Sequence, residues 1–229
     1  DGYIPTWGKT KTLPVIHDIN YEHDPSFMGR KSYLRYYKHF FPIFAKKATR
    51  VATVSEFSRR DIASVYQIAE SKIDVVYSAA KEEYKPCSKE EIVATKTRYT
   101  DSKDYFYFVG SLHKRKNLAN LFRAFDLFKT ETQSDVKLVI VGSKMWWKGE
   151  VAEAFEAMKY KDEVIFTSRL STEEVNCIAS ASIACMFVSL FEGFGVPPLE
   201  AFRSGTAAVV SDVTSMPEIC GDAALYADP

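Results

Sequence analysis

The sequence predicts an α/β fold built on a doubly wound parallel sheet. Short apolar runs of strand length alternate with amphipathic helices, and several runs are apolar at every position. Continuous apolar runs are typical of parallel strands covered on both faces, whereas half-exposed strands alternate. In such a sheet, ligands bind outside the carboxyl ends of the strands. The expected strands are Leu13–Ile16, Val51–Val54, Ile73–Tyr77, Tyr105–Val109, Val136–Val141, Val164–Phe166, Ile183–Leu190, Ala207–Val210 and Ala223–Tyr226.

Helix signals separate these runs. The apolar residues of 118–128 fall on one helical face, and Asn117 is the expected N-cap of that helix. Ser88 with Glu91, and Ser171 with Glu174, have the spacing of a capping box at the start of two further helices.

The strand runs are distributed unevenly along the chain. Residues 104–229 hold six of them in unbroken alternation with helices, which predicts a near-complete Rossmann-like domain. Residues 1–86 hold three and are expected to form the later part of a second such domain, incomplete in this chain. Residues 87–103 are polar and include a charged helix, so they are the expected linker.

Composition excludes several classes of protein. Of 229 residues, 46% are hydrophobic and 26% are charged, which excludes a disordered tail, a collagen-like fibre and a coiled coil. Lys+Arg and Asp+Glu both number 30, so no net charge attracts nucleic acid, and we expect no nucleic-acid partner. Four scattered cysteines without a C-x-x-C pair argue against a zinc site and are interpreted as reduced thiols of a cytoplasmic protein.

The segment Phe191–Glu200, with the sequence FEGFGVPPLE, carries the densest functional signal. It follows a buried strand and precedes a helix, and its glycines allow backbone amides to approach a ligand. A helix start after such a turn is a seat for phosphate. Glu192 and Glu200 would accept hydrogen bonds from sugar hydroxyls there. A Gly-Pro turn flanked by two helix-capping carboxylates remains the alternative.

A second signal lies in Tyr105–Asn117, where a strand and Gly110 lead into a cationic segment. Arg115 and Lys116 follow the first strand of the second domain, where a diphosphate would lie. A solvated basic loop is the alternative interpretation. The two signals sit on strand ends of one sheet, so they can converge.

Together with other short motifs, these segments resemble the retaining glycosyltransferases of family 4 (group 1), which have the GT-B architecture of two facing Rossmann-like domains. Glu192 and Glu200 match the E-x7-E motif of that family, and the pattern is most similar to bacterial mannosyltransferase-like members. The resemblance covers essentially the whole chain. Its other motifs are Val15–Asp18, Val54–Asp61, Val109–Gly110, Arg115–Asn117, Pro217–Glu218 and Gly221–Ala223.

The resemblance implies a role for each matched residue. Glu200 would hold the ribose hydroxyls of a nucleotide-sugar, and Glu192 would hold the transferred sugar. His17 would reach the donor from the first domain, so Glu192, His17 and Lys116 are the candidate catalytic residues. The other candidate donor-binding residues are Gly110, Ser111, Arg115, Gly193, Phe194 and Gly195.

The activity so implied is transfer of a hexose, with mannose from GDP-mannose as the expected donor, to a glycan or lipid-linked acceptor with retention of configuration, in polysaccharide biosynthesis. The chain contains no Asp-x-Asp, so we expect no metal and no cofactor beside the donor. A GT-B-fold nucleotide-sugar epimerase and a non-catalytic nucleotide-sugar-binding domain are the alternatives.

The stretch Gly29–Ser55 has seven Lys/Arg, no acid, and six aromatics between Tyr33 and Phe44. One interpretation is peripheral contact with an anionic membrane on its inner face, or with a lipid-diphosphate acceptor. The other is an ordinary domain helix that packs its aromatics inward and keeps its lysines in solvent.

Overall fold

The computed structural model describes residues 1–229 apart from 1–2, 6, 29–30, 144–146 and 148. The described contacts divide the chain into two compact units. The first comprises residues 1–78 together with 191–195 and 214–219. The second comprises residues 79–190, 196–213 and 220–229.

A six-stranded, all-parallel sheet forms the centre of the second unit. Its strands follow the order β5-β4-β3-β6-β7-β8, so the order reverses between β3 and β6. This is the order expected of a Rossmann-like doubly wound sheet. The strands are β3 (Tyr105–Val109), β4 (Lys137–Val141), β5 (Val164–Thr167), β6 (Ala184–Phe187), β7 (Ala207–Ser211) and β8 (Leu225–Ala227).

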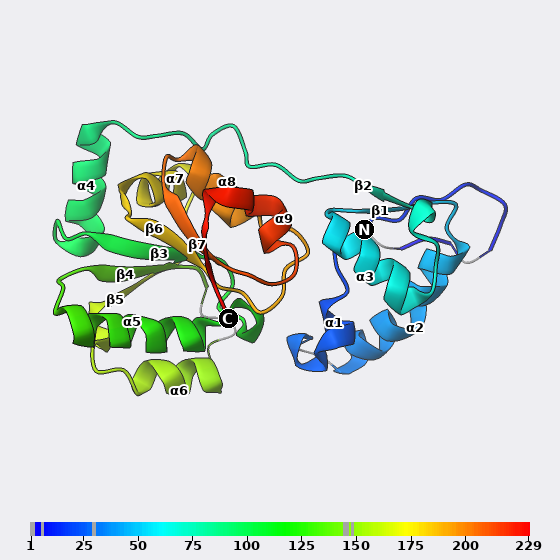
Figure 1. Cartoon of the computed structure of the whole chain (residues 1–229), viewed down its shortest axis with the longest axis horizontal. Helices are drawn as coiled ribbons and strands as arrows, with labels where there is room; N and C mark the ends of the chain where they lie inside the picture. Colours follow the sequence, from blue (N-terminus) through cyan, green and yellow to red (C-terminus); the bar gives the residue numbers. More distant parts are fainter. Residues whose placement is uncertain (1–2, 6, 29–30, 144–146, 148) are drawn as a thin grey trace. The chain divides into compact units, whose positions relative to one another are not determined.

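Helices cover both faces of this sheet. Figure 1 shows α5 and α6 below it and α7 and α8 above it. The apolar face predicted for residues 118–128 is confirmed, because Leu118, Leu121, Phe122 and Phe125 are buried against β3 and β4. The helices of this unit are α4 (Lys89–Thr100), α5 (Leu118–Thr132), α6 (Glu150–Glu156), α7 (Thr172–Ala181) and α8 (Val196–Arg203).

Two of the three predicted helix starts are confirmed. Ser88 and Ser171 each form a complete capping box with the glutamate three residues later. The prediction for Asn117 is wrong in its mechanism, because Asn117 precedes α5 in a left-handed conformation (φ 58°) and its side chain caps nothing. Asn117 also ends a 3-10 turn over Lys114–Lys116, and its left-handed backbone differs from the extended backbone of a residue whose side chain caps a helix.

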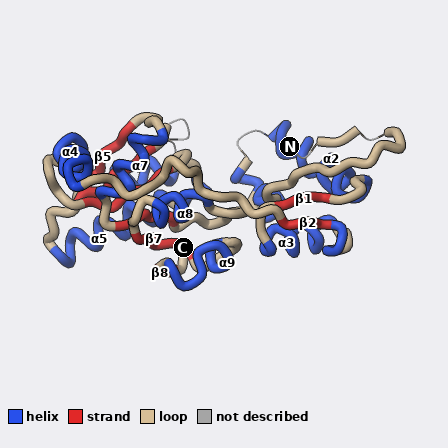
Figure 2. The backbone as a smooth tube through the Cα atoms, turned by 90° about the horizontal axis from the view of Figure 1, so that it is seen from above, coloured by secondary structure: helices blue, strands red, loops and turns tan. Residues whose placement is uncertain are grey.

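The first unit contains a much smaller sheet. Strands β1 (Val51–Thr53) and β2 (Ile73–Val75) are parallel and lie side by side in Figure 2. The strand predicted at Leu13–Ile16 is not formed, because only Val15 makes a single bridge, to Ala52. Its remaining positions are loop. Residues from the helices α1 (Asn20–His23), α2 (Lys31–Lys47) and α3 (Glu56–Tyr66) pack in one apolar core of this unit. The short helix α9 (Met216–Cys220) also belongs to this unit, apart from Cys220.

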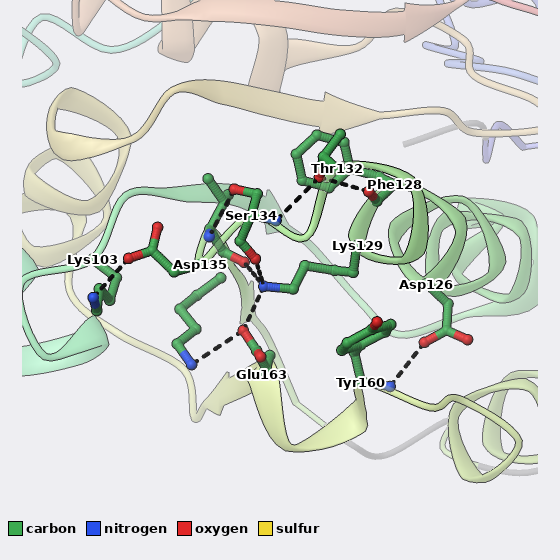
Figure 3. Close-up of polar contacts among 11 residues, drawn as sticks. Lys103, Asp126, Phe128, Lys129, Thr132, Ser134, Asp135, Tyr160 and Glu163 are labelled. Carbon is green, nitrogen blue, oxygen red and sulfur yellow. Dashed lines mark hydrogen bonds and ion pairs between the residues drawn. The ribbon is translucent and has the colours of Figure 1, made fainter.

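A buried lysine ties three elements together at the amino end of the larger sheet. Lys129, at the end of α5, is 2% exposed, and its ammonium group donates to the carbonyls of Ser134 and Val136. It also donates to the Glu163 carboxylate at 2.7 Å (Figure 3). The three accepting residues lie just before β4 or β5, so Lys129 fixes the C-terminus of α5 to the starts of both strands.

Candidate functional site

The carboxyl ends of β3 and β6 mark the place where the larger sheet reverses its order. In open α/β sheets, ligands bind in the crevice outside this reversal. The segments that follow these strands are linked, since the amide of Leu190 donates to the carbonyl of Arg115 at 2.9 Å. The two strand ends singled out in the sequence therefore meet in the structure.

A cavity of about 370 Å³ lies at the carboxyl ends of β3, β4 and β5. Gly110 and Ser111, both predicted to bind the donor, line it, and Ser111 is exposed. The loops after β3 and β4 touch closely, because a Cβ on Gly142 would overlap the carbonyl oxygen of Gly110. The other residues that line the cavity are Val109, Val141, Gly142, Ser143, Arg169, Leu170 and Val175.

Lys116 lies at the reversal point and is 9% exposed. Its ammonium group is 4.5 Å from the centre of the Phe187 ring, the last residue of β6. The interpretation of this segment as a solvated loop is therefore wrong for Lys116, because the 3-10 turn directs its side chain inward. Arg115 is half-buried and Lys114 is exposed. Burial lowers the pKa of His113 in the same turn, and the positive charges of Arg115 and Lys116 lower it further.

Glu200 lies in α8 and is half-buried. Burial raises the pKa of its carboxyl group, and a hydrogen bond from the Tyr84 hydroxyl and the charge of Lys81 oppose that rise. Burial also raises the pKa of Cys185 on β6 to about 12, and the negative charge of Glu200 adds to it. Cys185 is paired with Tyr107 of β3 across the reversal point, so Glu200 belongs to that region.

The loop 191–195 belongs to the first unit, and hydrogen bonds hold it there. The carbonyl of Gly193 accepts from the hydroxyls of Ser55 at 2.6 Å and Ser58 at 3.1 Å. The backbone of this loop also lies against His17, because a Cβ on Gly193 would be 2.7 Å from the His17 carbonyl oxygen. The structure thus brings His17 together with the glycine-rich loop.

Glu192 is 7% exposed, and both of its backbone groups are held. Its amide donates to the Thr214 hydroxyl at 3.2 Å, and its carbonyl accepts from the Ser215 hydroxyl at 3.0 Å. The same hydroxyl lies 2.9 Å from the carbonyl of Phe194, so its one proton is shared between the two carbonyls. One side chain therefore fixes the loop on both sides of Gly193.

The predicted site residues form two groups. Glu192, Gly193, Phe194, Gly195 and His17 lie in the first unit. Gly110, Ser111, Arg115, Lys116 and Glu200 lie in the second.

Sequence reasoning missed Tyr84, Thr214 and Ser215. An isolated tyrosine in a polar segment carries no motif. Thr214 and Ser215 lie just before the family motif Pro217–Glu218, but are not part of it. Glu218 of that motif accepts hydrogen bonds from the amides of Glu56 and Phe57 at the start of α3.

Over the described ranges, no group of three or more His, Cys, Asp or Glu side chains is arranged to hold a metal ion. No helix among the same residues is long and apolar enough to cross a membrane.

A family model described as glycosyl transferases group 1 matches residues 89–227. Over 96% of its length the chain is 28% identical to O-antigen chain mannosyltransferase B of Escherichia coli. It is 27% identical over 94% of its length to O-antigen chain mannosyltransferase RfbU of Salmonella typhimurium. The chain spans 58% and 56% of these two relatives.

Solved structures show the same fold. The crystal structure of Anabaena Alr3699/HepE in complex with UDP and glucose superposes with a TM-score of 0.79 at 16% identity, covering 96% of this chain and 58% of that one. The Rossmann-like, GT-B type of fold predicted from the sequence is therefore confirmed.

Proposed function

The chain belongs to the glycosyl transferases of group 1, and from that premise we propose that it transfers mannose from GDP-mannose to a glycan or lipid-linked acceptor in polysaccharide assembly. The observation that supports this most directly is the convergence of Gly110, Ser111 and Lys116 at the reversal point of the sheet. The names of the two mannosyltransferase relatives support the choice of sugar.

The proposed chemistry needs stabilisation of a leaving diphosphate. Cleavage of the anomeric bond develops negative charge on the diphosphate and positive charge on the sugar ring. Arg115 and Lys116 would neutralise the diphosphate, and the buried position of Lys116 strengthens this effect because water screens it less. We assign Gly110 and Ser111 to the nucleotide, and Glu200 to its ribose.

Glu192, His17 and the amides of 193–195 are assigned to the transferred sugar. The hydrogen bonds from Ser55, Ser58 and Ser215 would keep this loop rigid, so that its amides are oriented before the donor binds. We propose attack by the acceptor hydroxyl on the face that the diphosphate leaves, with retention, and no metal ion in the reaction.

A thermal-shift panel of nucleoside diphosphates, followed by transfer from GDP-mannose, tests this function. A ligand at 100 times its dissociation constant stabilises a fold by about 2.7 kcal/mol. We expect GDP to rank first and labelled mannose to appear on an acceptor. Epimerised donor would favour the epimerase, and nucleotide binding without any reaction would favour a non-catalytic domain.

We further propose that α2 contacts an anionic membrane surface on its cytoplasmic side. Phe41 and Phe44 are buried in the core, as the ordinary-helix interpretation expects. Tyr33 and Tyr36, however, are 52% and 37% exposed among basic residues of the same helix. These basic residues are Lys31, Arg35, Lys38, Lys46 and Lys47, while Gly29 and Arg30 lie outside the described residues.

Cosedimentation with vesicles tests the contact. Each Lys or Arg near an anionic surface is worth about 1 kcal/mol. The double variant Lys31→Ala/Arg35→Ala should therefore weaken binding to anionic vesicles by more than tenfold at low salt. Lys89→Ala, an exposed lysine of the second unit, is the control. Equal binding to neutral and anionic vesicles would reject the electrostatic contact.

A further inference from the structure

Residues 84–87 are anchored to the helices that follow the reversal point. The amide of Lys85 donates to Asn176 of α7 at 3.0 Å, and the amide of Cys87 donates to Ser180 at 3.3 Å. On α8, Arg203 donates to the carbonyl of Tyr84 at 3.4 Å. This segment therefore has a fixed place beside α8, although it contains no helix or strand.

Tyr84 is the residue of this segment that turns inward. It is 6% exposed, and its hydroxyl donates a hydrogen bond to the carboxylate of Glu200. An ionised carboxylate has two oxygens and about four acceptor positions. The phenol occupies one of them, and the half-exposed carboxylate keeps the others for a ligand.

We propose that Tyr84 is a positioning residue that holds the Glu200 carboxylate in the orientation needed to accept hydrogen bonds from the vicinal hydroxyls of a ribose. The inference rests on the proposed function, in which Glu200 binds the ribose of the donor. A glutamate side chain has several rotatable bonds, and ordering it costs free energy when a ligand binds. A donor that fixes it beforehand removes part of that cost.

The role of Tyr84 can be measured through the pH dependence of nucleotide affinity, because Tyr84 affects the ionisation of Glu200. Lys81 and Tyr84 approach it from the segment before α4, Tyr107 from β3 and Cys185 from β6, while Arg203 follows it on α8. Protonated Glu200 loses its charge-assisted acceptor, so nucleotide affinity falls as the pH falls through its pKa. Without the phenol donor that pKa is higher, so the fall begins at a higher pH.

Tyr84→Phe keeps the ring and removes only the hydroxyl. Tyr105→Phe is the matched control, because the buried Tyr105 hydroxyl donates to the carbonyl of Ile178 at 2.8 Å and not to Glu200. The ligands are GDP and its 2′,3′-dideoxy analogue, which lacks the two hydroxyls. Titration calorimetry gives each dissociation constant between pH 5 and 8, and thermal unfolding shows that each variant is folded.

We expect Tyr84→Phe to weaken GDP about tenfold, as loss of one hydrogen bond to a charged group does. It should leave the dideoxy analogue unchanged and move the acidic loss of GDP affinity to higher pH. Tyr105→Phe should change neither affinity nor pH profile. An equal loss for both ligands, or no loss for GDP, overturns the role of Tyr84. Failure of wild type to bind GDP or UDP instead overturns the proposed function.

Discussion

The two ends of the six-stranded sheet each bury a lysine, in very different surroundings. At the amino end, Lys129 is held by two carbonyls and the Glu163 carboxylate (Figure 3). At the carboxyl end, the Lys116 ammonium group faces the ring of Phe187. The Glu163 carboxylate forms an ion pair with Lys129, whereas the face of the Phe187 ring attracts the Lys116 ammonium group. The first environment is that of a structural ion pair, and in the proposed function the second lysine meets the leaving diphosphate.

The strongest test of this comparison removes the ammonium group at the amino end. Lys129→Met should lower the free energy of unfolding by about 3–5 kcal/mol, because it removes a buried ion pair with Glu163 and leaves the carbonyls of Ser134 and Val136 without their donor, although Lys137 still pairs with Glu163. Urea unfolding followed by circular dichroism measures it. In the absence of urea, the folded Lys129→Met variant should bind GDP with the affinity of the wild type. A specific loss of GDP affinity at unchanged stability would contradict the structural assignment.

Lys116→Ala should act on the reaction instead. Loss of one preorganised contact to developing charge lowers a rate by about 10²–10³. Affinity for GDP should fall, while affinity for guanosine, which lacks the diphosphate, should not. Lys114→Ala, an exposed lysine of the same turn, is the control and should leave both titrations close to wild type. Equal loss for GDP and guanosine would mean damage to the fold.

Acidification should affect the amino end through Glu163. Burial raises the pKa of this carboxyl group, but hydrogen bonds from Lys129 and Lys137 outweigh burial and leave it below the usual value of 4.5. A pKa that is lower in the folded state gives stability that is present above 4.5 and is lost as the pH falls through the folded-state pKa.

Glu163→Gln should therefore cost about 1.5–3 kcal/mol at pH 7. The difference from wild type should shrink as the pH falls below 4.5. Unfolding curves of both proteins between pH 3 and 7 measure it, and a difference that stays constant over this range would reject the ion pair as its source.

The smallest effect is expected for an exposed lysine at the same end. Lys103 pairs with Asp135 at 2.6 Å, but the two side chains are 47% and 69% exposed. Lys103→Ala should cost less than about 1 kcal/mol, since solvent and salt screen such pairs. A loss comparable to that of Lys129→Met would show that position at the sheet end, and not burial, sets the strength of these ion pairs.

Most of the larger sheet could be predicted from the sequence, because strands covered on both faces must be apolar throughout. The capping boxes at Ser88 and Ser171 were equally predictable, since each depends on residues three apart. The short run Leu13–Ile16 has the composition of a strand, but strand formation depends on a neighbour, and only Val15 finds one.

The sequence by itself determined the alternation of strands and helices and the residues that follow each strand, because these depend on local pattern and period. Only the tertiary structure decided that the ends of β3 and β6 adjoin, that Lys116 is buried while Lys114 is not, and that Tyr84 reaches Glu200. Tyr84 and Glu200 are far apart in sequence, so their contact depends on how α8 packs. Burial of one lysine in a basic run likewise depends on the turn that directs it and on the ring it meets across the sheet.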